Sequence, residues 1–433
     1  MNILVAGAGH GGLAAAGLLA KQGHSVKVFE RGPEENLGHD WTDIFDLTCF
    51  KEAGIPMPPP EEYTPSGQMT FVSPSRNYRI ETSVPAEDCL ECFMERRDIL
   101  RHLIAFARAN GAEIIFESRV ERPLVEGKRV VGLAVGGEEF RADLVIDSAG
   151  MNSPVRTQLP EEMGIIKSFR RDQYFSAFRA FFSRKQPAPQ KGKWTTYFFP
   201  LSHRGIAWVA DEEEYFDLLF GHLADNSRAL AEEVRQWVLP LHPEMADDIY
   251  RGGKVTSIPV RRPISRMAAD GYAAIGDAAA MTIPLIGSGI CNSIRAAILL
   301  CETVCSKNNR ANTAAELWPY QAAYMRNIGA SHAALDVLKA FMLSMRSEKI
   351  DALFEHRLIE EADMVGVRNG KGLKLTPKQM AVKGVRGRGH LPTLLRLSGT
   401  LTKSQKLTAH ALAIPEDYDE ARVKAWVERY DSF

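Results

Sequence analysis

An N-terminal strand–glycine–helix pattern constrains the fold of this 433-residue chain more than any other feature. Residues 3–30 read ILVAGAGHGGLAAAGLLAKQGHSVKVFE, which predicts a strand, a glycine turn, a helix and a second strand that ends at Glu30. Gly7 permits the tight turn, Gly9 lets the backbone approach a pyrophosphate, and Gly12 lets the helix pack close to its strand. The pyrophosphate lies at the positive helix N-terminus, and Glu30 accepts hydrogen bonds from a ribose diol. The pattern therefore predicts binding of NAD or FAD rather than NADP.

A second segment carries related chemistry. Residues 271–295 read GYAAIGDAAAMTIPLIGSGICNSIR and predict a strand that ends at Asp277, a loop that holds Pro284, and a helix opened by Gly287 and Gly289. A carboxylate at a strand end can bind a sugar-like hydroxyl, and the backbone N–H groups of the glycine turn can face an anion.

A third segment, residues 143–156, reads DLVIDSAGMNSPVR and predicts a buried strand followed by a turn and a cationic residue. Together the three segments resemble the FAD-dependent enzymes of the para-hydroxybenzoate hydroxylase type. This superfamily includes aromatic hydroxylases, ubiquinone-pathway hydroxylases and geranylgeranyl reductases. The resemblance implies FAD as the cofactor, with Asp277 on the ribityl chain and Pro284 against the flavin face. It also implies that Arg97, in the run ERRDIL that opens a helix, contacts the ribose or pyrophosphate of FAD.

The helix that begins near Gly289 completes the implied FAD site. Its N-terminus would stabilise negative charge on reduced flavin, and Gly287 and Asn292 are expected among the cofactor-binding residues. Two positions depart from the hydroxylase pattern: Ala149 stands where Asp is usual, and Ala280 stands where His is common. In the hydroxylases, the Asp and the His at these positions are linked to the handling of the nicotinamide cofactor. NAD(P)H, the expected electron donor, would therefore reduce the flavin either directly or through a separate flavin reductase.

Three functions are consistent with these motifs. The favoured hypothesis is an FAD monooxygenase that hydroxylates an aromatic or other hydrophobic small molecule, using O2 and NAD(P)H. The alternative is an FAD-dependent C=C reductase of isoprenoid or lipid substrates, because the alanine run 278–280 is similar to the small-residue run of geranylgeranyl reductases. The third is a non-catalytic flavin-binding partner or sensor. A flavin performs much of the chemistry itself, which suits a chain without an obvious acid–base pair.

The predicted fold is α/β, with a discontinuous Rossmann-like FAD-binding domain, an antiparallel β-sheet substrate domain and a helical, basic C-terminal extension. The expected bounds are 1–55, 93–160 and 262–312 for the FAD-binding domain, 56–92 and 161–261 for the substrate domain, and 313–433 for the extension. Thirteen of the 37 aromatic residues lie between Tyr174 and Phe220, in alternating strand patterns that predict a sheet core. One face of that sheet is expected to roof an apolar pocket over the flavin. The candidate pocket residues are Tyr197, Phe199, Trp208 and Pro284.

No catalytic residue is strongly indicated, and three weak candidates stand out. Cys49 lies where reductases of the resembling family place a cysteine near the flavin. Trp41 follows the second strand and could stack over the site, and His203 lies in a turn where it could act as an acid or base. Cys89 and Cys92 form one Cys-x-x-Cys, but no second pair stands at metal-binding spacing, so no metal site is expected.

Composition limits the partners. Lys and Arg number 53 against 54 Asp and Glu, a net charge of −1, which argues against nucleic-acid binding. No uninterrupted apolar stretch is long enough to predict a transmembrane segment. Six irregularly spaced cysteines and no recognisable leader predict a cytoplasmic protein.

Charge is uneven near the C-terminus. Residues 364–415 hold ten Lys or Arg and no Asp or Glu, and their glycines predict a loop-rich segment. A solvated basic surface is the simplest interpretation. The alternatives are docking to an anionic substrate, peripheral contact with a membrane leaflet, or binding of an acidic redox partner such as a flavin reductase.

Overall fold

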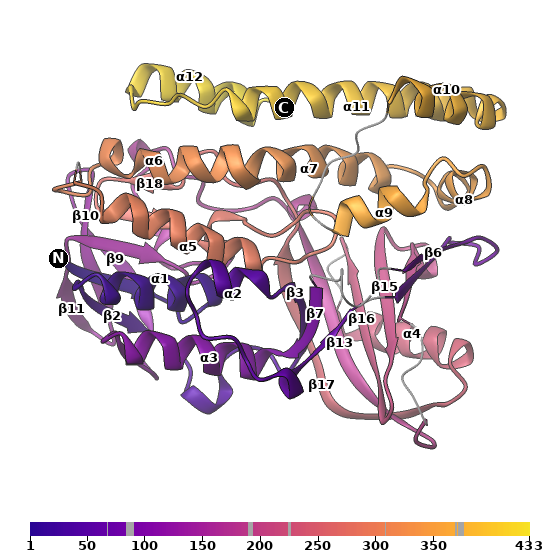
Figure 1. The fold of residues 1–433 in the computed structure, drawn as a ribbon, viewed down its shortest axis with the longest axis horizontal. Helices are drawn as coiled ribbons and strands as arrows, with labels where there is room; N and C mark the ends of the chain where they lie inside the picture. The colour runs from indigo at the N-terminus through magenta and orange to yellow at the C-terminus, as the bar shows by residue number, and fades with distance from the viewer. Residues whose placement is uncertain are drawn as a thin grey trace.

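The structure is a computed structural model of the chain. It describes residues 1–66, 68–83, 91–188, 194–223, 227–307, 309–368, 370 and 376–433. Figure 1 shows a sheet with helices at the N-terminal end, a large second sheet beside it, and a layer of C-terminal helices that runs along both.

A six-stranded sheet forms the N-terminal part, in the order β18-β19-β12-β1-β2-β8. Its strands are β1 (Asn2–Ala6), β2 (Ser25–Phe29), β8 (Glu113–Ile115), β12 (Leu144–Asp147), β18 (Ala268–Ala269) and β19 (Tyr272–Ala274). All of them pair in parallel except β18, which is an antiparallel edge strand. Continuous apolar runs form these strands because both faces of a parallel sheet are covered.

Helices and a small sheet cover this parallel sheet. Helices α1 (His10–Lys21), α3 (Arg96–Ala109) and α5 (Ile290–Val304) pack together, and the antiparallel strands β9 (Val120–Glu126), β10 (Arg129–Val135) and β11 (Glu138–Arg141) pack against β12. Helix α1 connects the parallel neighbours β1 and β2. The Rossmann-like α/β class predicted from the sequence is confirmed.

A seven-stranded sheet forms the second part, in the order β17-β13-β16-β15-β14-β5-β6. Its strands are β5 (Gln68–Val72), β6 (Arg79–Ser83), β13 (Tyr174–Arg184), β14 (Trp194–Phe198), β15 (Gly205–Asp211), β16 (Tyr215–His222) and β17 (Met245–Pro259). Neighbours are antiparallel except β14 and β5. Because side chains alternate along a strand, one face packs on α4 (Ser227–Val238) and the other lines the pocket described below.

A three-stranded sheet lies near the junction of these two parts (Figure 1). It has the order β3-β7-β4, with β3 (Thr42–Asp46), β4 (Tyr63–Pro65) and β7 (Glu91–Glu95), and the short helix α2 (Thr48–Glu52) follows β3.

The C-terminal part is helical. Its helices are α6 (Ala314–Tyr324), α7 (Ala330–Leu343), α8 (Ser347–Glu355), α9 (Glu361–Arg368), α10 (Pro377–Arg386), α11 (Leu391–Leu412) and α12 (Glu420–Asp431), and one π-helical turn (Met325–Gly329) joins α6 to α7. Helix α11 packs along α7 and forms, with α10 and α12, an outer layer (Figure 1). In the described part of the chain, no helix combines the length and apolar character needed to cross a membrane.

The prediction of a loop-rich segment at 364–415 is wrong for its described residues. Gly384 and Gly399 lie inside α10 and α11, where each costs about 1 kcal/mol relative to Ala. Local capping offsets this cost, because Thr376 accepts a hydrogen bond from the Gln379 N–H and Pro377 occupies the first position of α10. Tertiary packing against α7 also stabilises α11.

Candidate functional site: a dinucleotide cleft joined to an apolar pocket

The glycine turn after β1 packs tightly on the turn after β12. Gly7 has φ +87°, and a Cβ there would lie 2.8 Å from the Ser148 carbonyl oxygen. A Cβ on Gly12 would lie 2.7 Å from Ser148 Cβ, and the Gly12 N–H donates to Ser148 Oγ at 3.1 Å. Gly9 caps α1 without a side-chain hydrogen bond, and the first turn holds no acidic residue. The N-terminus of α1 is therefore suited to binding an anionic pyrophosphate.

Glu30 lies beside this turn, directly after β2. Its carboxylate accepts hydrogen bonds from the Ala8 N–H at 2.9 Å and the Gly32 N–H at 3.1 Å. These two bonds hold the carboxylate next to the glycine turn, where the predicted ribose diol would lie.

Asp277 follows β19 on the same edge of the sheet. It is half-buried, and Thr282 Oγ1 donates to its carboxylate at 2.9 Å. Burial raises the pKa of Asp277, and the hydrogen bond from Thr282 and the charge of Arg96 partly oppose this rise. The carboxylate lies where parallel strands end, the usual position of ligands in open α/β sheets.

Arg96 and Arg97 lie differently although they are adjacent. The Arg96 guanidinium donates to Asp43 through Nε at 2.5 Å and a terminal nitrogen at 2.6 Å, and its side chain is 17% exposed. The Arg97 side chain is 58% exposed and lies 3.5 Å from Asp40. Successive residues of a helix point about 100° apart, so only one of them can face the cleft. The geometry favours Arg96, while the role assigned to Arg97 stays a prediction.

His10, the first residue of α1, is a further group that sequence reasoning missed. Its Nε2 is buried and has no hydrogen-bond partner. Burial and, to a smaller extent, the charge of Arg96 lower the pKa of His10 to about 4, against an opposing effect of Asp43. A buried imidazole nitrogen that lacks a partner beside the glycine turn fits a site that binds a polar ligand.

The loop before α5 lies next to these groups. Gly287 has φ +75°, and Gly289 caps α5 without a side-chain hydrogen bond or an acidic residue in the first turn. Asn292 of α5 is buried, and its Nδ2 lies 3.4 Å from Nε2 of His332 on α7. Two uncapped helix N-termini, Glu30, Asp277 and the orphaned His10 nitrogen together fit the groups of FAD.

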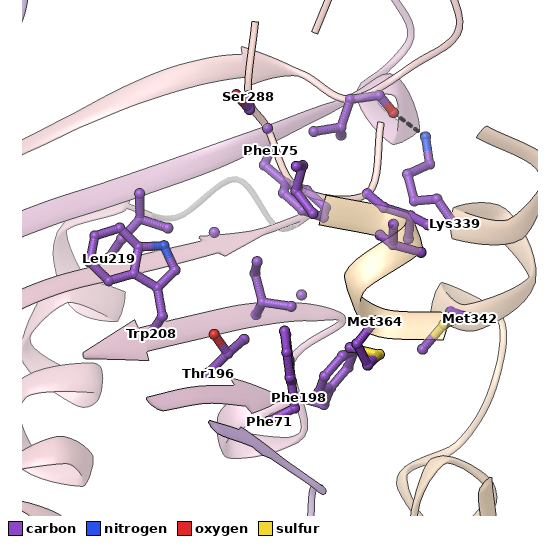
Figure 2. Close-up of a pocket in the computed structure, with 18 of the residues that line it drawn as sticks. Phe71, Phe175, Thr196, Phe198, Trp208, Leu219, Ser288, Lys339, Met342 and Met364 are labelled. Atoms are coloured by element: carbon purple, nitrogen blue, oxygen red, sulfur yellow. Dashed lines mark hydrogen bonds between the residues drawn. The ribbon is translucent and has the colours of Figure 1, made fainter. Parts of the chain in front are cut away.

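A cavity of about 290 Å³ adjoins this cleft. Figure 2 shows side chains from the seven-stranded sheet on one side of the cavity and side chains from the C-terminal helices on the other. The residues labelled there are Phe71, Phe175, Thr196, Phe198, Trp208, Leu219, Ser288, Lys339, Met342 and Met364. The lining is mainly apolar, which suits a hydrophobic ligand.

Trp41 lies in this cavity beside two guanidinium groups. The ring centroid is 5.0 Å from Cζ of Arg96 and 5.4 Å from Cζ of Arg179. Arg179 is buried and pairs with Asp217 through two hydrogen bonds. These cation–π contacts hold the indole in place at the junction of cavity and cleft.

Residues 1–316 match a family model described as an FAD binding domain. The chain belongs to this FAD-binding family. It is also similar to the digeranylgeranylglycerophospholipid reductase of Haloferax volcanii, with 25% identity over 384 residues, 83% of this chain and 90% of the relative. The enzyme of the same name from Sulfolobus acidocaldarius is 20% identical over 456 residues, which cover 96% of this chain and 93% of the relative.

Solved structures share the fold of this FAD-binding protein. A geranylgeranyl bacteriochlorophyll reductase-like protein from Thermoplasma acidophilum superposes with a TM-score of 0.73 at 18% identity, covering 92% of this chain and 98% of that one. A probable FAD-dependent monooxygenase from Pseudomonas aeruginosa gives 0.60 at 19% identity, covering 82% and 99%. With the family match, these similarities confirm an FAD-dependent oxidoreductase of the predicted superfamily.

Some predicted pocket residues of the FAD-binding protein line the cavity and others do not. Phe199 and Trp208 line it, whereas Tyr197 and Pro284 do not. Tyr197 faces α4, where its ring lies 5.2 Å from that of Trp237, and its hydroxyl lies 3.1 Å from Nε2 of His242 beyond the helix. Strand alternation turns Thr196 and Phe198 toward the cavity instead. Phe199 also reaches the cavity because its φ of +48° breaks the alternation.

Two of the three catalytic candidates lie away from the cavity. His203 Nε2 is 3.6 Å from the carboxylate of Glu233 on α4, at the other face of the large sheet. Cys49 is fully buried in α2, and its hydrogen bond with Cys291, followed by burial, raises the pKa of its thiol. Only Trp41 is in contact with the cavity.

The proposed Cys-x-x-Cys cannot be placed as a pair, since Cys89 lies outside the described residues and Cys92 is buried in β7. Across the residues that the structure describes, no cluster of three or more His, Cys, Asp or Glu is arranged to hold a metal ion.

Proposed function

We propose that the protein is an FAD-dependent reductase that saturates a C=C bond of an isoprenoid-like lipid. The observation that carries this proposal is the reach of the apolar cavity. Its lining begins at the loop 285–289 and the first residue of α5. It crosses the pocket face of the large sheet and continues between helices α7, α8, α9, α10 and α11. A cavity built this way suits a long, branched hydrocarbon chain, because each buried methylene contributes about 0.8 kcal/mol of binding free energy.

The polar groups at the end of the cavity next to the FAD cleft suit the positioning of a substrate and the exclusion of water from it. Arg96 and Arg179 are each neutralised by a buried carboxylate and hold Trp41 between them. Bound FAD supplies hydride transfer. The N-terminus of α5 favours negative charge near Gly289, and the apolar walls exclude water from the reacting bond.

The curated relatives support a reductase, since both are named for reduction of digeranylgeranylglycerophospholipid. The alanines at 149 and 280 are compatible with this class and with electron delivery by a separate protein. We propose NAD(P)H as the ultimate donor, either directly or through a flavin reductase.

Anaerobic turnover tests the proposal. The FAD-loaded protein is reduced chemically, mixed with detergent-dispersed geranylgeranyl lipids, and the products are analysed by mass spectrometry for the gain of two hydrogens per double bond. Phe198→Trp, which places a larger side chain in the cavity, should lower turnover, while Tyr197→Phe on the opposite face serves as the matched control. Failure of the reduced protein to alter any polyprenyl chain would contradict the reductase proposal.

A monooxygenase is the second candidate, since a probable FAD-dependent monooxygenase shares the fold over 82% of the chain. The aromatic lining contributed by Phe71, Phe175 and Trp208 also suits a planar substrate. Label from isotopically substituted O2 in the product would favour this function over reduction.

A further inference from the structure

The outer helices expose an unusual concentration of apolar side chains. Twelve large hydrophobic residues are exposed in the described part of the chain, and five of them lie within residues 380–395. They are Met380, Val382, Val385, Leu391 and Leu395. Val385 is 69% and Leu395 is 65% exposed. We call this region, from Lys378 on α10 to Lys406 on α11, the α10–α11 surface.

Helical periodicity groups four of these residues into two pairs. Val382 and Val385 are three positions apart on α10, and Leu391 and Leu395 are four apart on α11, so the members of each pair are neighbours on one face. Figure 1 shows both helices in the outermost layer of the molecule. Each pair is therefore exposed on one face of a helix in this outer layer.

The inner faces of the same helices line the cavity. Leu397 and Leu401 of α11 and Lys383 of α10 are cavity residues, as is Met364 of α9. The helices that carry the exposed apolar side chains are thus the wall of the cavity at the end distant from the FAD cleft.

The charge of this surface is one-sided. Residues 378–406 contain seven Lys or Arg and no Asp or Glu. Arg386 pairs with Glu360, and Lys383 is buried against Asp363. The remaining exposed cations on α10, the following turn and α11 include Lys378, Arg388, Lys403 and Lys406, for which the described residues provide no ion-pair partner.

We propose that the α10–α11 surface docks the protein on an anionic lipid bilayer. Exposed leucine and valine side chains enter the acyl boundary, while the flanking lysines and arginines bind lipid phosphates, as in interfacial helices. Docking places the distal wall of the cavity at the bilayer, where an apolar chain resides. The role in substrate delivery rests on the proposed function, whereas docking itself does not.

An acidic protein is the main alternative to a lipid bilayer as the binding partner of this basic surface. Basic residues alone would suit an acidic protein or an anionic bilayer equally well. The same short segment, however, also exposes five large apolar side chains between its cations in the sequence. This combination is the pattern of interfacial membrane helices, which bind by apolar burial plus attraction to anionic headgroups. The observations therefore favour a bilayer.

Vesicle co-sedimentation of the full-length, FAD-loaded protein tests the proposal. Vesicles of phosphatidylglycerol mixed with phosphatidylcholine are compared with pure phosphatidylcholine, at low and high salt. Lys378→Gln/Arg388→Gln removes two cations, and Val385→Ser/Leu395→Ser removes two apolar side chains. The matched controls are Lys21→Gln/Lys51→Gln on exposed positions of α1 and α2, and Ile249→Ser/Val255→Ser on β17, far from the outer helix layer in Figure 1.

The wild type is expected to bind the anionic vesicles and to dissociate as salt screens the headgroups. Each cation near an anionic surface contributes about fivefold to partitioning, so the variant that lacks two cations should bind about 25-fold more weakly. The apolar variant should lose a similar factor even at low salt, and both control variants should bind like the wild type.

Two results would overturn docking: no vesicle binding by the wild type, or equal vesicle binding by all variants. In the first case, binding of the wild type to polyglutamate would favour an acidic protein partner instead. FAD content and anaerobic turnover of detergent-dispersed substrate are measured on the same variants. Lost vesicle binding with normal detergent turnover supports a docking role. Vesicle binding without any lipid reduction would remove the proposed function and leave docking intact.

Discussion

Replacing Arg96 by Met should destabilise the protein strongly. The change leaves the Asp43 carboxylate, 10% exposed in its side chain, without the guanidinium that binds both its oxygens at 2.5 and 2.6 Å. Removing one partner of a buried pair costs about 3–5 kcal/mol because the other charge stays buried. The cation–π contact with Trp41 is lost as well and contributes about 0.5–2 kcal/mol. We expect the free energy of unfolding to fall by about 4 kcal/mol.

Urea denaturation of the apoprotein measures this loss without a contribution from bound FAD. Arg97→Met is the matched control, because that side chain is 58% exposed and 3.5 Å from Asp40, and it should change stability by less than about 0.5 kcal/mol. Adding Asp43→Asn to Arg96→Met should recover about 2 kcal/mol, since the unpaired charge is gone. A loss below about 1 kcal/mol for Arg96→Met would refute the argument that the pair is buried and energetically coupled.

The same pair predicts a pH dependence. Burial raises the pKa of Asp43, but the charge and hydrogen bonds of Arg96 outweigh this effect, so the pKa lies below its usual value. A carboxylate with a lowered folded-state pKa stabilises the fold above its unfolded pKa, about 3.9, and this stabilisation is lost as pH falls through the folded-state pKa. In Arg96→Met, burial without the guanidinium raises the pKa of the same carboxyl. The stability difference between wild type and variant should therefore be largest where Asp43 is ionised in both folded proteins, and should shrink as pH falls through the raised pKa of the variant and then through the lowered pKa of the wild type. A difference that grows on acidification would contradict the assigned sign.

Further predictions concern the cofactor and the cavity. Glu30→Ala should weaken FAD binding by about 10- to 100-fold, roughly the value of one hydrogen bond from the ribose to a charged acceptor, as measured by flavin fluorescence titration. Gly12→Val should yield protein without flavin absorbance, because its Cβ would lie 2.7 Å from Ser148 Cβ; a flavin-loaded mutant would disprove the close approach. Phe198→Ala should raise KM for an apolar substrate by about tenfold through lost burial, whereas Tyr197→Phe should leave KM unchanged, and equal effects would place both on one face.

Much of the cofactor site is local in sequence, and this is why it could be predicted. Gly7, Gly9, Gly12 and Glu30 lie within one strand–helix–strand unit, whose geometry depends on short-range turns and strand pairing. The structure adds a tertiary reason for the glycines, since Ser148, more than 130 residues away, leaves no room for a Cβ. Nothing near residue 12 in the sequence indicates that contact.

Other residues of the site could not be predicted, because the direction in which their side chains point depends on tertiary packing. Arg96 and Arg97 are indistinguishable by composition, and only the packing of α3 against Asp43 turns one of them inward. Tyr197 and Phe198 are neighbouring aromatic residues, and only the register of β14 in the sheet assigns them to opposite faces. A shift of one residue in the register of a strand moves every side chain to the opposite face of the sheet. Aromatic content alone does not specify that register.

The sequence by itself therefore determined the α/β class, the dinucleotide turn and the FAD-binding character of this protein, because these follow from local spacing and side-chain chemistry. The tertiary structure alone decided which residues form the cavity and that helices from 330 to 412 close it beside the large sheet. It also decided that the glycine-bearing basic segment folds into helices with an exposed apolar edge. Those outcomes arise from packing between segments hundreds of residues apart, whose free energy no local pattern records.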